Sequence, residues 1–513
     1  MTIGALLQSL DRMTPASERS RAFAMAPGAL EVEARGVTHD SRQAAPGWIF
    51  VALRGRTADG AAFAPQAIAR GAAAVIAERE PATTLAGGVE TVNVPWLVVE
   101  DARLALALIA AEVHGHPSRR MQVVGVTGTN GKTTTSYLLS AMFEAAGVRC
   151  GLMGTVAYRI GAREVQATRT TPEAPEVQDL LRQMADEGCA ACVMEVSSHA
   201  LALRRVDGTQ FVAAVFTNLT RDHLDFHANM EEYFAAKRRL FEMLPAGAPA
   251  VVNLDDPRGA ALAEAVPQPV TYAINRAAEV TPGPLSFSLT GLGFDVRTRQ
   301  GVVRVRSRLV GRPNVYNILA ATAAASALGV PLESIERGLE QLPGVPGRFE
   351  LASGADDDIT VVVDYAHTDD ALRNLLETAR PLAERRLITV FGCGGDRDRS
   401  KRPLMGMVAA RLSDMVVITS DNPRSEDPAR IIEEARRGAQ PEVRTGRPEL
   451  LAIVDRREAI HDAVRRARPG DVVLVAGKGH EKSQELGGRV LPFDDVAVAR
   501  EALAARRVRS RVG

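Results

Sequence analysis

Long apolar runs that each end in a polar or Gly-rich turn constrain this chain more than any other feature. Four of them lie in its last third, at Ile359–His367, Leu387–Asp396, Met415–Pro423 and Asp471–Glu481. They alternate with stretches of helical composition, and runs that are apolar throughout are typical of strands buried on both faces. The pattern predicts α/β domains with parallel sheets. Because ligands of such sheets bind beyond the carboxyl ends of the strands, the pattern also places function in these turns.

Two earlier blocks repeat this alternation, so the chain divides into three parts. At 513 residues it has room for about three domains. Segments rich in Gly and Pro, His114–Arg120 and Leu342–Arg348, are typical of linkers between the blocks. We therefore expect a smaller α/β N-terminal domain over residues 1–117, a central P-loop-type domain with a parallel sheet over 118–346, and a Rossmann-like C-terminal domain over 347–513.

Charge and apolar content exclude several classes of protein. Lys plus Arg and Asp plus Glu each number 62, so the basic excess of a nucleic-acid-binding protein or a polybasic membrane anchor is missing. The apolar stretch Leu104–Ala111 is far shorter than the roughly 20 residues that cross a bilayer, and the first residues do not resemble a signal peptide. Cys189 and Cys192 form a CxxC without a second pair, which favours packing over a metal site. We expect a cytoplasmic protein.

The strongest local motif is GVTGTNGKTTT at Gly125–Thr135, which follows an apolar strand and precedes a helix. Glycines let the backbone turn and point N–H groups at phosphate, Lys132 would reach the β- and γ-phosphates, and the Thr133 hydroxyl would hold Mg²⁺. The strict pattern fails at one place, where Val126 stands instead of Gly. A Gly-rich turn that only caps a helix is the structural alternative. The motif predicts nucleotide binding by Gly128, Thr129, Asn130, Gly131, Lys132, Thr133 and Thr134.

Three further residues have both a chemical and a structural interpretation. Glu195 ends a buried strand, where a carboxylate suits Mg²⁺ but could also form an ion pair. His223 is, from the residues alone, a polar residue at a helix start. Lys237 is, on periodicity alone, a helix-surface lysine.

The phosphate motif resembles that of the Mur ligases and the folylpolyglutamate synthases, and many more segments resemble the Mur ligases alone. They run in family order between residues 38 and 495: TTPEA, MEVSSHAL, FTNLTRDHLDFH, YFAAKRRLF, GRPNVYNILAA, GRFE, VVVDYAHTDDAL, FGCGGDRDRSKRPLMG, DNPRSEDP and AGKGHE. The chain is most similar to the MurE branch of that family. The resemblance implies an enzyme of peptidoglycan synthesis that uses ATP to join an amino acid to the D-glutamate γ-carboxylate of UDP-N-acetylmuramoyl-L-alanyl-D-glutamate through an acyl phosphate.

The resemblance also implies roles around the nucleotide. It assigns catalysis to Lys132, Glu195, His223 and Lys237, and Mg²⁺ binding to Thr133, Glu195, His223 and a Lys237 carbamylated by CO₂. It adds four ATP-binding residues: Asn314, Asn317, Arg348 and Asp364. Taken alone, Asn314 could instead be a helix N-cap.

For the UDP-muramoyl dipeptide, the resemblance implies binding by residues of the first two blocks: His39, Ser41, Arg42, Arg56, Thr57, Ala58, Thr170, Thr171, Ser197, Leu203 and Arg205. Two positions depart from the family pattern. Leu203 stands where Gln is frequent, and Arg169 stands where some members have Asn. We expect one substrate hydrogen bond to be replaced or missing there.

DNPR at Asp421–Arg424 resembles the pattern of members that add meso-diaminopimelate. The distal carboxylate of meso-diaminopimelate would pair with Arg424 in bidentate fashion, whereas lysine has no such carboxylate. The implied pocket contains Arg397, Asp421, Asn422, Pro423, Arg424, Gly477 and Glu481, and Glu481 would accept the ammonium group. A surface salt bridge is the structural alternative for Arg424.

Other functions remain as alternatives. They are a lysine-adding ligase, a folylpolyglutamate synthase-like ligase, and a degenerate P-loop protein with a scaffolding role. GCGGD at Gly392–Asp396 could suggest a dinucleotide turn, but it lacks the GxGxxG spacing and the acidic residue about twenty positions on. The expected partners are ATP, the UDP-muramoyl dipeptide and meso-diaminopimelate, with no nucleic acid and no membrane insertion. We expect a monomer.

Overall fold

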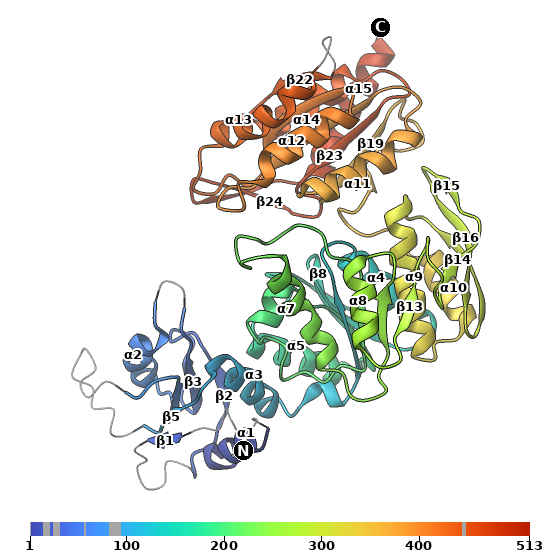
Figure 1. Ribbon diagram of the computed structural model, residues 1–513. Helices are drawn as coiled ribbons and strands as arrows, with labels where there is room; N and C mark the ends of the chain where they lie inside the picture. Colours follow the sequence, from blue (N-terminus) through green and yellow to red (C-terminus); the bar gives the residue numbers. More distant parts are fainter. Residues whose placement is uncertain are drawn as a thin grey trace. The chain divides into compact units, whose positions relative to one another are not determined.

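A computed structural model describes residues 2–13, 21–23, 31–55, 58–81, 94–443 and 448–512 (Figure 1). The predicted substrate residues Arg56 and Thr57 lie outside the described residues. The chain divides into two compact units. The first comprises residues 1–127, 148–214 and 236–248, and the second comprises 128–147, 215–235 and 249–513.

The first unit begins with a five-stranded sheet of order β1-β5-β4-β3-β2, in which only β1 is antiparallel to its neighbour. Ile49 and Val51 pack on one face of this sheet, while Phe50 and Ala52 pack on the other. Helices therefore cover both faces, as the apolar runs predict. The elements are α1 (Ile3–Met13), β1 (Arg21–Phe23), β2 (Gly36–Thr38), β3 (Trp48–Ala52), α2 (Ala64–Ala69), β4 (Ala74–Ala77), β5 (Trp96–Val98) and α3 (Ala102–Val113), with the 3₁₀ turns η3 (Gly60–Phe63) and η5 (Pro117–Arg119).

The same unit holds a second run of strands in the order β6-β10-β7-β8-β9. The parallel prediction is confirmed for β6, β10 and β7, whereas β8 and β9 are antiparallel. Every residue of β9 is exposed, so this edge strand carries no apolar run that would predict it. The elements are β6 (Gln122–Thr127), β7 (Cys150–Met153), β8 (Ala157–Ile160), β9 (Arg163–Gln166), α5 (Ala174–Asp186), β10 (Ala191–Glu195) and α6 (Ser198–Ala202); β11 (Ala213–Phe216) and α7 (Met230–Glu242) follow in the chain.

The second unit contains an antiparallel sheet that the sequence analysis missed. In β16, Leu292, Phe294 and Val296 are buried while Asp295 and Arg297 are exposed, which is the alternation of a half-buried strand. The sheet consists of β14 (Thr281–Pro282), β15 (Ser286–Ser288), β16 (Gly291–Thr298) and β17 (Gly301–Ser307). Around it in sequence lie α4 (Lys132–Ala145), β12 (Ala250–Asn253), α8 (Pro257–Ala265), β13 (Val270–Tyr272), α9 (Arg312–Ala327) and α10 (Leu332–Gln341).

A six-stranded sheet of order β18-β19-β23-β20-β21-β22 ends the chain, and only β18 is antiparallel to its neighbour. Neighbouring residues of β19 point to opposite faces, Val362 into one core and Val361 and Val363 into the other. The strands are β18 (Glu350–Leu351), β19 (Thr360–Asp364), β20 (Leu387–Cys393), β21 (Met415–Ser420), β22 (Glu449–Ala452) and β23 (Val472–Ala476).

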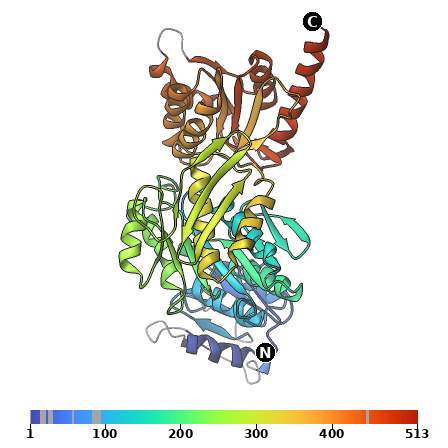
Figure 2. The same cartoon turned by 90° about the vertical axis from the view of Figure 1, so that its right-hand side faces the viewer.

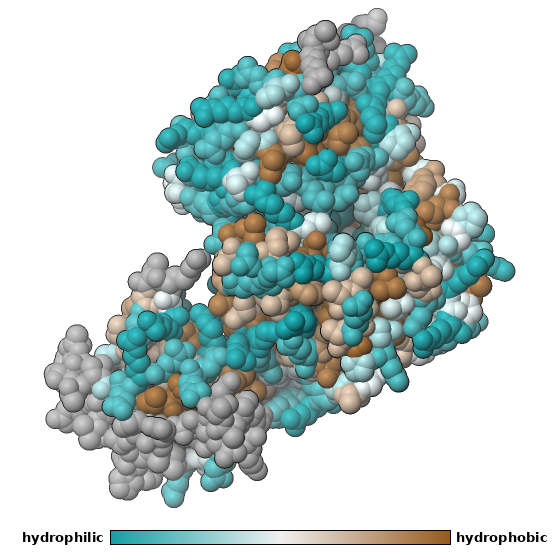
Figure 3. All heavy atoms as spheres, viewed as in Figure 1, coloured by the Kyte–Doolittle hydropathy of each residue, from teal (hydrophilic) through white to brown (hydrophobic). Residues whose placement is uncertain are grey.

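Helices cover both faces of this sheet. Those of one face are α11 (Asp369–Ala379), α12 (Lys401–Leu412) and α13 (Pro428–Ala439), and those of the other are α14 (Arg456–Arg466) and α15 (Asp495–Val512). In Figure 2, α15 (red) runs along one side of the sheet. The face in Figure 3 shows mostly hydrophilic side chains over these helices. This part of the chain also contains the hairpin of β24 (Ser483–Leu486) and β25 (Arg489–Pro492) and the 3₁₀ turns η6 (Arg380–Leu382) and η7 (Gln440–Glu442).

All four cysteines are buried and none forms a disulfide, which agrees with the packing predicted for Cys189 and Cys192. Burial raises the pKa of the Cys192 thiol well above its ordinary value. Among the described residues, no cluster of three or more His, Cys, Asp or Glu side chains is arranged to hold a metal ion. In the part of the chain that the structure covers, no helix is long and apolar enough to cross a membrane.

Candidate active site

The phosphate loop lies between the end of β6 at Thr127 and the start of α4 at Lys132. Gly128 and Gly131 both have positive φ, +146° and +87°. A Cβ on Gly128 would lie 1.8 Å from Thr217 Oγ1, and one on Gly131 would lie 2.3 Å from Asn317 Oδ1. Both positions therefore require glycine, for the space as well as for the backbone angle. Lys132 Nζ donates to the carbonyls of Gly128 (2.9 Å) and Thr129 (2.8 Å).

Residues that the sequence analysis missed hold this loop in shape. Asn130 donates its backbone N–H to Asn218 Oδ1 (2.9 Å) and accepts from Thr217 Oγ1 at its carbonyl (2.6 Å). The hydroxyls of Thr129 and Tyr233 are 3.1 Å apart. Burial raises the pKa of Tyr233, so its hydroxyl stays protonated. These partners stand about 90 residues away in sequence, where no local pattern could point to them.

A cavity of about 780 Å³ opens beside the loop. Asn130, Gly131 and Asn317 are among its lining residues. Asn317 Nδ2 donates to Asn314 Oδ1 (2.9 Å), and Asn314 Nδ2 donates to the Val310 carbonyl (2.8 Å). Of the two predicted asparagines, Asn317 thus faces the cavity and Asn314 orients it. The N-cap alternative for Asn314 is wrong, because Gly311 occupies that position of α9.

A carboxylate that was not predicted also lines the cavity. Asp255 Oδ2 accepts hydrogen bonds from the Tyr316 hydroxyl (2.9 Å) and the Asn275 N–H (2.9 Å). Desolvation and the Asp255 carboxylate raise the pKa of Tyr316 to about 12. The cavity wall thus carries a neutral phenol hydroxyl held by an acceptor.

Arg348 and Asp364 were both predicted at the nucleotide; Arg348 stands just before β18 and Asp364 is the last residue of β19. Arg348 Nη2 donates to Thr133 Oγ1 (3.1 Å), and its guanidinium carbon lies 4.4 Å from the centre of the Tyr365 ring. The Asp364 carboxylate accepts the backbone N–H groups of Phe349 (2.7 Å) and Ala366 (2.8 Å). Burial raises the pKa of Asp364. Asp364 therefore fixes the backbone next to Arg348 and next to Tyr365, the residue whose ring Arg348 covers.

His223 adopts a left-handed backbone conformation (φ 56°) beside Asp222. Its N–H donates to Asp222 Oδ1 (2.9 Å), and its Nε2 is 3.4 Å from Asp222 Oδ2. Burial opposes ionisation of Asp222, but His223, His367 and Lys401 lower its pKa to about 2. Burial and Lys401 lower the pKa of His367 to about 4, so its ring is neutral at pH 7. This cluster lies in the second unit.

Glu195 and Lys237, in the first unit, are both 1 % exposed. The Glu195 carboxylate accepts the N–H (2.8 Å) and the hydroxyl (3.1 Å) of Thr155. Periodicity alone places Lys237 on the helix surface. The structure corrects this interpretation, because the Lys237 side chain lies on the buried face of α7. The error arises because periodicity gives the spacing of a face but not which neighbour covers it.

The residues predicted to contact the muramoyl dipeptide form a continuous polar chain with Glu195. The hydroxyls of Thr155 and Thr170 are 3.0 Å apart, and Thr171 Oγ1 donates to the Glu195 carbonyl (2.8 Å). Thr171 also donates to Ser197 Oγ (3.3 Å), which caps α6. The structure thus brings together Thr170, Thr171 and Ser197 at the carboxyl end of β10.

Two arginines share one carboxylate beside this chain. Arg205 Nη2 lies 2.7 Å from Glu173 Oε1, and Arg169 pairs with the same oxygen. Arg205 also donates to the Thr171 carbonyl (3.1 Å). Leu203 ends α6 and offers no polar group. The departure at Arg169 therefore adds a cation next to Arg205, while the departure at Leu203 removes a hydrogen-bonding side chain.

The predicted residues of the N-terminal sheet lie after β2. Ser41 is buried and donates to Gln66 Oε1 (2.7 Å), whereas Arg42 is exposed and pairs with Asp40 (2.7 Å). Hydrogen bonding to Arg42 lowers the pKa of Asp40 to about 2. Burial lowers the pKa of His39, and its Nδ1 is buried without a hydrogen-bond partner among the described residues. Ala58 accepts the Gly55 N–H (2.9 Å).

The predicted amino-acid residues gather at the carboxyl ends of β20, β21 and β23. Asn422 Nδ2 donates to Glu481 Oε2 (2.7 Å). Lys478, which is fully buried, donates to Glu481 Oε2 (3.0 Å) and Asn422 Oδ1 (3.0 Å) and lies 3.6 Å from Asp421 Oδ1. Lys478 was not predicted, although it stands inside AGKGHE. A substrate ammonium group would share the Glu481 carboxylate with it.

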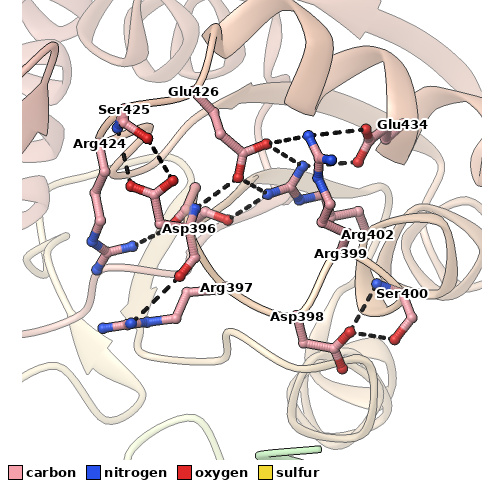
Figure 4. A network of polar contacts seen from close by, with 12 residues as sticks. Asp396, Arg397, Asp398, Arg399, Ser400, Arg402, Arg424, Ser425, Glu426 and Glu434 are labelled. Atoms are coloured by element: carbon pink, nitrogen blue, oxygen red, sulfur yellow. Dashed lines mark hydrogen bonds and ion pairs between the residues drawn. The ribbon is translucent and has the colours of Figure 1, made fainter. Parts of the chain in front are cut away.

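Gly477, Pro423 and the two arginines complete this group. Gly477 has a φ of +118°, and a Cβ there would lie 2.9 Å from Asp421 Oδ2. Pro423 is buried. Arg424 Nη1 donates to the Gly395 carbonyl (2.7 Å), whereas Arg397 is exposed and forms no ion pair within the described chain (Figure 4).

Fold and sites together define an α/β protein with a phosphate loop, a nucleotide-sized cavity and basic loops at strand ends. Three family models match the chain: "Mur ligase family, catalytic domain" over residues 33–114, "Mur ligase middle domain" over 126–325, and "Mur ligase, glutamate ligase domain" over 347–479. The chain belongs to the Mur ligase family, which has a three-domain α/β architecture. The predicted domain boundaries stay predictions.

Relatives match over nearly the whole chain. The "UDP-N-acetylmuramoyl-L-alanyl-D-glutamate--2,6-diaminopimelate ligase" of Solibacter usitatus is 46 % identical over 98 % of this chain and 98 % of its own length. The protein of that name from Alkaliphilus metalliredigens is 44 % identical over 92 % of this chain and 94 % of its own. A solved structure of a protein with this name covers 99 % of this chain and 100 % of its own, at 34 % identity and a TM-score of 0.66. The MurF ligase from Thermotoga maritima in complex with ADP shares the fold (20 % identity, TM-score 0.60, 95 % of this chain and 100 % of that one).

Proposed function

We propose that this chain is an ATP-dependent amide ligase of peptidoglycan synthesis. It adds meso-diaminopimelate to the γ-carboxylate of D-glutamate in UDP-N-acetylmuramoyl-L-alanyl-D-glutamate. The observation that carries the proposal is the pair of arginines, Arg397 and Arg424, on loops at the ends of β20 and β21. Whole-length relatives named for this activity support it.

The chemistry requires an activated carboxylate, because a free carboxylate does not form an amide with an amine. The γ-phosphoryl group of ATP passes to the substrate γ-carboxylate, which gives an acyl phosphate and ADP. The amine then attacks the acyl carbon, and inorganic phosphate leaves. Such transfers need positioning and cations more than covalent help from the protein. Lys132 supplies a cation, and the N–H groups at the start of α4 position the phosphates.

ATP occupies the cavity beside the phosphate loop, with Asn317 on the purine side. Gly131 lines this cavity, and any side chain at that position would collide with Asn317. Arg348 reaches the first turn of α4 through Thr133 and lies near the phosphates.

Magnesium is part of this proposal. Oxygen donors suit it, and the predicted ligands Thr133 and Glu195 present a hydroxyl and a carboxylate, with His223 near the phosphates. Lys237 is 1 % exposed, and conversion of its ammonium group to a carbamate would give Mg²⁺ oxygen ligands at this buried place. When bound, Mg²⁺ neutralises phosphate charge during transfer.

The dipeptide end of the nucleotide substrate binds along the hydroxyls of Thr170, Thr171 and Ser197, and Arg205 pairs with its carboxylate. His39, Ser41 and Arg42 contact the uridine end. Arg169, beside Arg205, replaces the hydrogen bond that Leu203 cannot make.

Arg424 binds the distal carboxylate of diaminopimelate, and Glu481 accepts the ammonium group of the same end. Arg397, Asn422 and Gly477 complete the pocket. We place the reaction in the cytoplasm, on the support of four buried cysteines that form no disulfide, and assign it to a monomer.

Phosphate release with the UDP-muramoyl dipeptide and ATP tests the function. Turnover with meso-diaminopimelate and about thirtyfold to 150-fold lower kcat/KM with L-lysine is the expected result, since a lost charge-assisted pair costs roughly 2–3 kcal/mol. Equal or better turnover with lysine would favour the lysine-adding alternative. Turnover with a folate and glutamate would favour the folylpolyglutamate synthase-like alternative, and no turnover at all would favour the scaffold.

Lys237→Ala tests the carbamate separately. Activity should fall by at least about a hundredfold, as expected for loss of a group that holds the metal, and short carboxylic acids should restore part of it. Rescue by short amines instead would show that the lysine acts as a cation.

A further inference from the structure

Two loops carry the arginines of the amino-acid site, and both contain a strained residue. The first loop, residues 394–400, joins β20 to α12, and the second, residues 421–427, joins β21 to α13. Asp396 and Arg424 both have a φ of +54°. For a residue with a side chain this left-handed conformation costs about 1–2 kcal/mol and persists only where the surroundings enforce it.

Hydrogen bonds and close backbone contacts join the two loops. Gly395 donates its N–H to the Asn422 carbonyl (2.9 Å), and Arg424 Nη1 donates to the Gly395 carbonyl (2.7 Å). A Cβ on Gly395 would lie 1.9 Å from the Pro423 carbonyl oxygen, so the loops approach as closely as backbones can. The Asp396 carboxylate accepts both the N–H (3.1 Å) and the hydroxyl (2.6 Å) of Ser425.

Glu426 of the second loop is the centre of the network in Figure 4. Its carboxylate accepts the backbone N–H of the strained Asp396 (2.7 Å), and it pairs with Arg399 (2.7 Å) and Arg402 (2.8 Å). Hydrogen bonding to Arg402 lowers the pKa of Glu426 to about 2. The Arg402 side chain is fully buried and donates also to Glu434 of α13 (2.8 Å) and to the Gly394 carbonyl (3.2 Å).

This pairing decides which arginines remain for a ligand. Glu426 pairs with Arg399 and Arg402, and Asp396 binds Ser425; among the described residues neither carboxylate forms an ion pair with Arg397 or Arg424. Within the described ranges, the hydrogen bond of the Arg397 side chain goes to the Asp396 carbonyl (3.5 Å). Arg424 Nε lies 3.5 Å from Glu485, whose side chain is 44 % exposed. In Figure 4 both of these guanidinium groups lie on the same side of the network.

We propose that Glu426 is a positioning residue of the amino-acid site. It holds the left-handed turn at Asp396 against the second loop, and through that turn it sets the spacing of Arg397 and Arg424. This inference rests on the proposed function for the identity of the ligand, but its geometric part does not.

Glu426→Gln tests the proposal, with Glu433→Gln as the matched control. Glu433 lies seven residues further on, on the surface of α13, where it pairs with Arg436 and Arg437 of the same helix. The KM for meso-diaminopimelate should rise about tenfold to a hundredfold in Glu426→Gln, as expected for lost hydrogen bonds to a charged group. The KM values for ATP and for the UDP-muramoyl dipeptide should stay within about twofold. The control should match the wild type.

A second readout does not depend on turnover. Exchange of the Asp396 amide hydrogen should become at least about tenfold faster in Glu426→Gln and stay unchanged in Glu433→Gln. Ser425→Ala, an exposed change that leaves Arg402 paired, should raise the diaminopimelate KM in the same direction. An unchanged KM and unchanged exchange would overturn the proposal, and so would a rise of all three KM values together. Wild-type protein without turnover would refute the proposed function alone, because the exchange experiment still decides the geometry.

Discussion

Replacing the buried Lys478 by Met tests whether one internal cation holds the ammonium end of the amino-acid site. The Lys478 side chain is fully buried, and its ammonium lies 3.0 Å from Glu481 and 3.6 Å from Asp421. Met has a similar length, so the change removes the charge and the hydrogen bonds without opening a large cavity.

The burial of its partners sets the magnitude. Removing one member of a buried ion pair costs about 3–5 kcal/mol, because the other charge stays uncompensated. The Asp421 side chain is 8 % exposed, but that of Glu481 is 31 % exposed, so water offsets part of the loss at Glu481. We therefore expect Lys478→Met to lower the free energy of unfolding by about 2–4 kcal/mol.

Lys482→Met is the matched control. Lys482 lies four residues further on and pairs with Asp494 at 2.8 Å, but its side chain is 56 % exposed. Exposed pairs contribute about 0–1 kcal/mol, so the control should unfold almost as the wild type does.

Calorimetry of both variants and their KM for meso-diaminopimelate provide the assay. We expect Lys478→Met to unfold at lower temperature and to raise that KM at least about tenfold, since Glu481 and Asn422 lose their shared donor. If Lys478→Met unfolds at the same temperature as Lys482→Met and keeps the wild-type KM for meso-diaminopimelate, a buried cation does not order this cluster.

Three further predictions address the nucleotide loop, stability and pH. Gly131→Ala should raise the KM for ATP at least about tenfold, because the new Cβ would lie 2.3 Å from the Asn317 amide oxygen and φ is +87°; steady-state kinetics measure it. Arg456→Met should destabilise the protein by about 3–5 kcal/mol in calorimetry, because it leaves Asp495, wholly buried and 2.7 Å away, without its cation. Stability should decrease as pH falls from about 6.5 towards 4, because the folded-state pKa of His367, about 4, lies below its ordinary value and unfolding takes up a proton in that range. In His367→Gln, thermal unfolding should be less sensitive to pH in that range.

Controls separate these effects from general damage. Gly147→Ala has a similar φ of +79° but open space around its Cβ, so it isolates backbone strain from the collision at Gly131. Arg457→Met removes a pair in which both side chains are more than half exposed, and it should cost under about 1 kcal/mol. Equal effects in variant and control would show that packing at the named residue is not the cause.

The buried parallel strands could be predicted from the sequence, because a strand covered on both faces must be apolar throughout. β20 is buried over all seven residues from Leu387 to Cys393, and the predicted run contains it. The sheet of β14 to β17 could not be found in this way, since its two longer strands alternate between buried and more exposed residues. Its alternation in Gly291–Ser307 was the available signal.

Residues of the candidate site were predictable where chemistry lies inside a motif and not where it depends on a distant partner. Lys132 and Asn317 stand in motifs. Asn218 and Tyr233 support the phosphate loop from 88 and 104 residues away, and only the fold brings them there. Burial was also hidden: nothing in the spacing around Lys237 distinguishes a covered helix face from a solvated one.

The formal net charge of zero conceals how the charges are divided. Some arginines are committed to internal acids, as Arg456 is to Asp495, while Arg397 has no carboxylate partner in the described part of the chain. Total charge near the site and placement of the arginines therefore predict opposite effects of Glu426→Gln on the binding of the amino acid. If the total charge near the site governed binding, Glu426→Gln would remove a negative charge and tighten the binding of an anionic amino acid. If the placement of the arginines governs it, the same change loosens the loops and weakens binding. Because a displaced guanidinium loses its bidentate geometry, whereas exposed charges at longer range are screened by salt, placement should prevail.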